Sequence, residues 1–153
     1  QEAQWRRALP LRAGEALPKE LDALVVRADG ILGLVELKAE GVDLRRAALQ
    51  VAAHAAVFRT LIAERGASYV DDSVVGLLRQ KDKVGLLGLA GRMTLRDEVP
   101  IMPIIAAPDE RADWAARWTE EIESTRLACG DLLTGLRFWR LSPDGEVLDE
   151  RRA

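Results

Sequence analysis

Residues 20–38 read ELDALVVRADGILGLVELK, and this stretch decides the fold. Two short apolar runs, Leu21–Arg27 and Ile31–Lys38, are separated by a three-residue Ala-Asp-Gly segment. Asp-Gly between apolar runs that contain β-branched residues is the strongest short-range signal for a tight β-hairpin. We therefore predict two antiparallel strands that fold back on each other at Asp29 and Gly30.

Three charged residues lie at one end of this predicted hairpin. Side chains two apart on a strand point to the same face, so Glu36 and Lys38 share a face of the second strand. Asp22 lies on the first strand, and the hairpin brings its carboxylate near that of Glu36. Two acids and a lysine after an apolar stretch cost stability unless they bind a ligand, and a divalent metal ion is the usual ligand.

The spacing of these residues resembles that of a known superfamily. Asp22, thirteen intervening residues and then Glu36-x-Lys38 look like the core of the PD-(D/E)xK nucleases. The resemblance implies the restriction-endonuclease-like fold, an α/β domain with a mixed central sheet flanked by helices in the order αβββαβ. It also implies a metal-dependent nuclease that hydrolyses phosphodiester bonds, in DNA more often than in RNA.

The resemblance covers residues 17–61, a core motif within a domain that we expect to span residues 1–153. Its last part is Gln50 followed by His54, similar to the Gln-x-x-x-Tyr element of the RecB-like branch, with His in place of Tyr. The order of the elements is also similar to the nuclease-related NERD subgroup. Gln50 and His54 either face the scissile phosphate or form a polar border on a half-buried helix.

The resemblance assigns a Mg²⁺ or Mn²⁺ site to oxygen ligands. Asp22, Glu36 and the backbone carbonyl of Leu37 are its implied ligands, and Glu20 or Glu40 is a candidate for a second metal contact. Such ligands suit hard divalent cations rather than zinc. The sequence has one His and one Cys, which excludes a zinc finger, a His cluster and a Cys-His dyad.

The same resemblance gives Lys38 and Gln50 catalytic roles. Lys38 would orient the attacking water and stabilise developing negative charge, and Gln50 would support the water or the lysine. Only four of the 22 basic residues are lysines, so a lysine in the Glu-x-Lys motif is less expected by chance. Two alternatives stay open: a nuclease fold that has lost activity and serves in binding or assembly, and an unrelated α/β domain whose charges diverge into solvent.

Composition and charge bound the cellular setting and the partners. The chain has 153 residues, 48% of them hydrophobic, which is enough for one domain with its own core. The lone Cys129 and the lack of a long apolar run or signal peptide favour a cytoplasmic protein without membrane contact. The first residue is Gln rather than Met, which suggests a trimmed segment of a longer protein.

The net charge of −3 and the pI near 5.3 argue against a large independent nucleic-acid interface. A local stripe of arginines can still bind phosphates in an acidic protein. We therefore expect nucleic acid to be the partner, with a homodimer or a partner domain helping to target the chain.

The remaining segments give coarser predictions. A helix is predicted from its N-cap Asp43 to Gly66, with an apolar stripe at helical spacing. Residues 74–78 and 84–90 are either two strands joined by a basic turn or part of a helix that begins after Asp72. Val99–Ala107 reads as a buried strand that its two prolines restrict to an edge or an irregular path.

The last third of the chain predicts a helix and a hairpin. The helix begins near Pro108 and ends near Ala128. Trp114 and Trp118 lie on one of its faces, where core packing is favoured over stacking on bases. Residues 136–148 read as two strands joined by a Ser-Pro-Asp-Gly turn.

Overall fold

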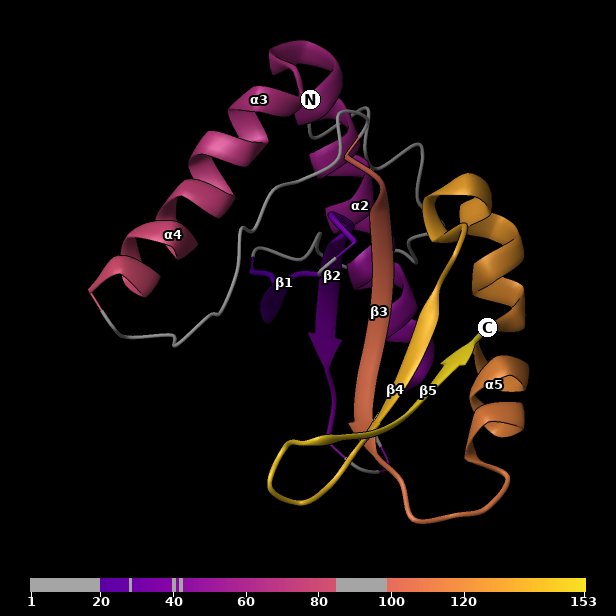
Figure 1. Ribbon diagram of the computed structural model, residues 1–153. Coiled ribbons are helices and arrows are strands. Elements are labelled where there is room, and N and C mark those ends of the chain that lie inside the picture. The colour runs from indigo at the N-terminus through magenta and orange to yellow at the C-terminus, as the bar shows by residue number, and fades with distance from the viewer. Residues whose placement is uncertain (1–19, 28, 40, 42, 85–98) are drawn as a thin grey trace.

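The computed structural model describes residues 20–27, 29–39, 41, 43–84 and 99–153. Within this part, five strands form one sheet with the order β1-β2-β3-β4-β5 (Figure 1). The two outer pairs are antiparallel and β2, β3 and β4 are parallel, so the sheet is mixed as predicted. The strands are β1 (Ala23–Val26), β2 (Leu32–Leu37), β3 (Ile101–Pro108), β4 (Arg137–Leu141) and β5 (Val147–Arg152).

The first hairpin forms where the Asp-Gly signal placed it. β1 and β2 pair antiparallel, with Ala23 opposite Val35. Two backbone hydrogen bonds close the turn between the strands: Arg27 N donates to Ile31 O at 3.0 Å, and Gly30 N donates to Arg27 O at 2.9 Å. The φ of Gly30 is 79°, a left-handed conformation that glycine adopts without a steric penalty. The middle of the turn includes Ala28, which lies outside the described residues.

The helix after β2, α2 (Leu44–Arg65), confirms the predicted boundaries. Asp43 caps its first turn, since its carboxylate accepts a hydrogen bond from Arg45 N at 2.9 Å. Gly66, with φ 85°, ends the helix. The predicted apolar stripe is buried in the first part of the helix and packs partly buried against the core in the second; its members are Ala47, Val51, Ala55, Phe58 and Ile62.

Two helices pack on one face of the sheet and make the main core. They are α2 and α5 (Trp114–Cys129), and a short 3₁₀ helix, η2 (Gly130–Leu133), follows α5. Leu34, Ile105 and Phe138 project from three neighbouring strands into this core and are fully buried. A smaller buried cluster with Val35 and Ile104 lies on the opposite face. Glu36 belongs to the same face as Leu34, which places its side chain on the helix side of the sheet.

The buried strand predicted over Val99–Ala107 forms as β3, but it is the third of the five strands, so the edge position, one of the two alternatives drawn from its prolines, is wrong. Pro103 is tolerated because of where its nitrogen points. Lys38 N donates to Ala106 O, so even-numbered residues of β3 turn their backbone groups toward β2 and Pro103 turns toward β4. The pairing of β4 begins only at Ile104, one residue later. The missing N–H of Pro103 therefore removes no hydrogen bond from the ladder.

The middle segment is helical, as the second of the two alternatives proposed. It consists of α3 (Ala67–Val70), a π-helical turn η1 (Asp71–Val75) and α4 (Gly76–Lys83). The helix begins before Asp71 rather than after Asp72. Figure 1 shows this arm leaving the end of α2 and extending away from the sheet. The predicted apolar stretch 84–90 lies outside the described residues, apart from Val84.

The predicted start of α5 is wrong by several residues. Pro108 is the last residue of β3 and pairs with Leu141, and α5 begins at Trp114. Trp114 and Trp118 are both buried and stack edge to face with ring centroids 4.9 Å apart. The core-packing interpretation is therefore confirmed, and neither ring is free to stack on a base. Cys129, the last residue of α5, is a buried thiol as expected.

The last hairpin confirms its prediction. β4 and β5 pair antiparallel, and the turn between them is closed by a hydrogen bond from Gly145 N to Ser142 O at 3.0 Å. Among the described residues two strands, not three, precede α2, and residues 1–19 lie outside the description. None of the described helices is long and apolar enough to cross a membrane.

Candidate active site

The three charged residues of the sequence motif converge in space. Asp22 lies one residue before Ala23, whose partner is Val35, so Asp22 lies opposite Glu36 across the hairpin. Lys38 Nζ is 3.2 Å from Glu36 Oε2 and 3.9 Å from Asp22 Oδ2. The interpretation that these charges diverge into solvent is therefore contradicted.

Backbone contacts fix the position of this cluster. Asp22, the residue just before β1, accepts a hydrogen bond through its Oδ2 from Leu37 N at 2.8 Å. On the other side of β2, Lys38 N donates to Ala106 O at 2.8 Å. The chain on both sides of the Leu37 carbonyl is thus held, by a carboxylate on one side and by β3 on the other.

Glu36 is the most unusual residue of the cluster because it is charged and fully buried. Its side chain is 1% exposed, whereas that of Lys38 is 14% exposed and that of Asp22 is 38% exposed. Oε2 accepts a hydrogen bond from Lys38 Nζ, but Oε1 has no hydrogen-bond partner among the described residues. Leaving a buried carboxylate oxygen without a partner costs stability.

His54 lies close to this oxygen without satisfying it. His54 Nε2 is 2.9 Å from the carbonyl oxygen of Glu20 and 3.3 Å from Glu36 Oε1. A carbonyl oxygen only accepts hydrogen bonds, so Nε2 carries a proton and directs it to the nearer oxygen, that of Glu20. His54 therefore ties α2 to the segment that leads into β1, and it leaves Glu36 Oε1 available.

The other predicted contacts are less complete. Gln50 lies one turn before His54 on α2, and its Oε1 is buried without a hydrogen-bond partner among the described residues. Gln50 makes no hydrogen bond to Asp22, Glu36 or Lys38 in this part of the chain. The contribution of Glu20 comes from its backbone rather than its exposed side chain, and Glu40 lies outside the described residues.

The cluster offers oxygen atoms of the type that hard divalent cations bind. The described residues contain no group of three His, Cys, Asp or Glu side chains that could hold a metal ion. A set of two carboxylates and one carbonyl oxygen remains, and the cluster of Asp22, Glu36 and Lys38 carries one negative charge in excess. The buried, unpartnered Oε1 of Glu36 is an oxygen of the kind that Mg²⁺ and Mn²⁺ bind.

A second polar centre, which sequence reasoning missed, lies just beyond β3. Asp109 is buried; its carboxylate accepts two hydrogen bonds from the Arg111 guanidinium, at 2.8 and 2.7 Å, and one from Trp118 Nε1 at 3.1 Å. The hydrogen bonds from Arg111 lower the pKa of Asp109 to about 2, against the opposing effect of burial. The Pro-Asp-Glu sequence reads equally well as a helix start, so only the tertiary contact to Trp118 reveals this role.

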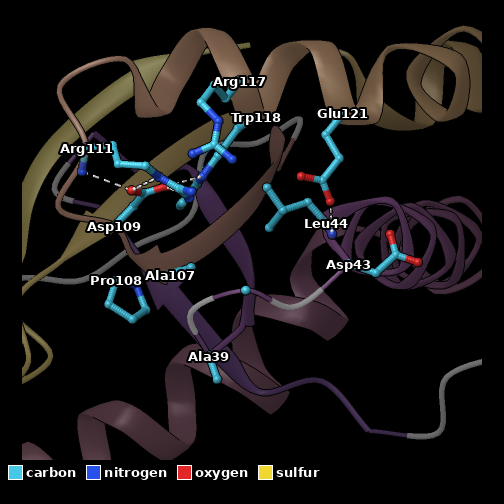
Figure 2. A pocket seen from close by; sticks show the side chains of 11 residues that line it. Ala39, Asp43, Leu44, Ala107, Pro108, Asp109, Arg111, Arg117, Trp118 and Glu121 are labelled. Atoms are coloured by element: carbon cyan, nitrogen blue, oxygen red, sulfur yellow. Dashed lines mark hydrogen bonds and ion pairs between the residues drawn. The ribbon is translucent and has the colours of Figure 1, made fainter.

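Asp109 and Arg111 line a cavity of about 320 Å³ between the N-terminal ends of α2 and α5, here called the α2–α5 cavity. Figure 2 shows Arg111, Arg117, Asp109 and Trp118 grouped at one end, and Glu121, Leu44 and Asp43 at the other. At the second end Glu121 Oε1 accepts a hydrogen bond from Leu44 N at 2.8 Å, which caps α2 from a neighbouring helix.

Comparison of the chain with protein families, with curated proteins and with solved structures finds no match to any of them. The geometry of the site therefore carries the functional argument.

Proposed function

We propose that this protein is a metal-dependent nuclease that hydrolyses phosphodiester bonds, in DNA rather than RNA, at the cluster of Asp22, Glu36 and Lys38. The resemblance of this motif to the PD-(D/E)xK nucleases, and with it the restriction-endonuclease-like fold, is part of the proposal. The mixed α/β sheet and the antiparallel hairpin that bears the motif support it.

One observation carries the proposal. Glu36 is fully buried, it is the second-last residue of the apolar strand β2, and one of its oxygens has no hydrogen-bond partner among the described residues. An apolar residue at this position would pack on α2 without the cost of burying a charge. Asp22 places a second carboxylate directly opposite, so the two acids form a pair that a divalent cation would neutralise.

The ligands in this proposal are Asp22, Glu36 and the Leu37 carbonyl, and the ion supplies Lewis-acid chemistry at the phosphate when it is bound. Lys38 Nζ lies close to both acids, 3.2 Å from Glu36 Oε2 and 3.9 Å from Asp22 Oδ2. With substrate present, its ammonium donates hydrogen bonds to the attacking water and to the oxygens on which negative charge develops.

Two further residues support this arrangement. His54 holds the segment before β1 against α2 through the Glu20 carbonyl, so the Asp22 carboxylate stays opposite Glu36. Gln50 projects from the same side of α2 as His54, one turn away, and its buried Oε1 is free to accept a hydrogen bond from the water or from Lys38.

The test is cleavage of plasmid and single-stranded DNA, and of RNA, with Mg²⁺ or Mn²⁺. Glu36→Gln and Lys38→Met should abolish metal-dependent cleavage. The matched controls are Glu146→Gln and Lys83→Met, which alter exposed side chains outside the cluster of Asp22, Glu36 and Lys38 and should leave cleavage unchanged.

Two outcomes would contradict the proposal. Equal cleavage by all five proteins would show that a contaminating enzyme is responsible. A folded wild-type protein that binds metal but cleaves neither DNA nor RNA would favour the alternative of an inactive nuclease-fold module for binding or assembly.

A further inference from the structure

A second cavity lies next to the α2–α5 cavity at the carboxyl end of the parallel strands. It has a volume of about 360 Å³, lies between the start of α5 and the strands β4 and β5, and is here called the β4–α5 cavity. Arg111 lines both cavities, Arg117 lines the first, and Arg140 and Arg151 line the second. Four guanidinium groups thus border one continuous edge of the molecule, although the chain as a whole is acidic.

Two of these arginines have no ion-pair partner in the described part of the chain. Arg117 projects from the first half of α5 into the α2–α5 cavity (Figure 2). Arg140 lies opposite Asp149 in the sheet, but the Asp149 carboxylate accepts instead from Arg151 Nε at 3.1 Å. Arg140 Nε is buried without a hydrogen-bond partner. A buried guanidinium nitrogen without an acceptor costs stability unless a ligand supplies one.

The sheet register connects Arg140 to the candidate active site. Leu37 pairs with Ala106 and Arg140 pairs with Ala107, so Lys38, Ala107 and Arg140 lie in one row across three strands. All three belong to the face that bears α2 and α5. Two strand spacings separate Lys38 from Arg140, roughly 10 Å between backbones, and the small side chain of Ala107 lies between them.

Most acidic side chains that line these cavities already have partners, except Asp113 of the β4–α5 cavity, which makes no ion pair within the described part of the chain. Both carboxylate oxygens of Asp109 accept hydrogen bonds, from Arg111 and from Trp118. Asp43 and Glu121 accept hydrogen bonds from the first backbone N–H groups of α2, at the end of the α2–α5 cavity away from the arginines. Arg111 and Arg151 are paired with Asp109 and Asp149, whereas Arg117 and Arg140 have no carboxylate partner in the described part of the chain and Asp113 offsets their charge only in part.

We infer that this edge, from Lys38 past Arg117 to Arg140, binds the sugar-phosphate backbone of the nucleic-acid strand that the site cleaves. The inference rests on the proposed function and adds the path of the substrate to it. Arginine suits this role because its planar guanidinium donates two parallel hydrogen bonds to a phosphate. Contacts to the backbone alone give affinity without reading the base sequence.

The test is the salt dependence of binding, measured by fluorescence anisotropy with a short fluorescein-labelled oligo(dT) in EDTA, so that no cleavage occurs. The logarithm of the binding constant falls linearly with the logarithm of the salt concentration. Each phosphate contact that is lost lowers the absolute value of this slope by about 0.7 for a single strand. Arg117→Met and Arg140→Met should each lower the slope by about that amount, and the double variant by about twice as much. Arg152→Met, at the opposite end of the β4–β5 pair, is the matched control and should keep the wild-type slope.

A second measurement separates binding from folding. Arg140→Met removes a buried nitrogen that has no acceptor, so its thermal midpoint should not fall below that of the wild type. In cleavage assays the same variant should raise KM and leave kcat within about twofold, because it removes binding that is equal in ground and transition states.

The outcomes distinguish this inference from the proposed function. Cleavage that depends on Glu36, together with wild-type slopes for both arginine variants, overturns the inference and leaves the nuclease proposal in place. Reduced slopes without any metal-dependent cleavage support the arginine surface as a nucleic-acid binding site and overturn the nuclease proposal.

Discussion

The contact between Glu36 and Lys38 allows the sharpest energetic prediction. Replacing Lys38 by Met removes the ammonium 3.2 Å from Glu36 Oε2 and leaves a carboxylate whose side chain is 1% exposed. The nearest remaining donor, His54 Nε2, is already directed at the Glu20 carbonyl. The Lys38→Met variant therefore buries an uncompensated negative charge.

The expected cost follows from this geometry. Breaking a buried ion pair by removing one partner costs about 3 to 5 kcal/mol, and the lower end applies because the lysine is partly exposed. A loss of about 3 kcal/mol lowers the thermal midpoint by about 6 to 12 °C in a domain of this size. Glu36→Gln should cost about 1 kcal/mol or less, since Asp22 still accompanies the lysine.

Urea denaturation of the wild type, both single variants and the Glu36→Gln/Lys38→Met double variant measures the coupling. The double variant should be more stable than Lys38→Met alone, with a coupling energy of about 2 kcal/mol between the two positions. A Lys38→Met protein within about 0.5 kcal/mol of the wild type, or additive effects in the double variant, would refute the view that Glu36 is a buried charge held by Lys38.

Three further predictions test other parts of the structure. The pKa of Asp109 is lowered from 3.8 to about 2, so its carboxylate adds stability above about pH 4, and this stability is lost as the pH falls through 2. Asp109→Asn should remove up to about 2 kcal/mol of this pH dependence, and an unchanged acid-unfolding curve would contradict the Arg111 contact. Burial raises the pKa of the Cys129 thiol to about 11, so this thiol should react with Ellman's reagent at pH 8 far more slowly in the native protein than in urea, whereas equal rates would show that it is accessible. His54→Ala removes the hydrogen bond to the Glu20 carbonyl and should destabilise the protein by about 2 kcal/mol in urea, while a change below about 0.5 kcal/mol would show that this tie is dispensable.

Local signals in the sequence were sufficient for the elements that build the site. The Asp-Gly turn sets the register of the first hairpin, and that register alone places Asp22 opposite Glu36. The capping residues Asp43 and Gly66 likewise define α2. In each case the interaction that decides the structure lies within a few residues of the signal.

The elements that sequence reasoning misplaced depend on distant contacts. Pro103 is compatible with a central strand only because β4 begins to pair one residue later, at Ile104. The sequence of β3 itself does not indicate where this pairing begins. The sequence predicts the start of α5 near Pro108 because Asp109 resembles a helix-capping residue, but Asp109 accepts a hydrogen bond from Trp118 and the helix begins at Trp114. The contact of His54 with a backbone carbonyl near β1 is tertiary in the same way.

The measurement that tests the central claim most directly is Mn²⁺ binding by titration calorimetry, with the wild type, Glu36→Gln and Glu146→Gln compared under identical conditions. If the buried carboxylate opposite Asp22 is a metal ligand, the wild type and Glu146→Gln bind Mn²⁺ with the same affinity and Glu36→Gln loses that binding. Equal binding by Glu36→Gln would place the metal elsewhere and contradict the account of this site.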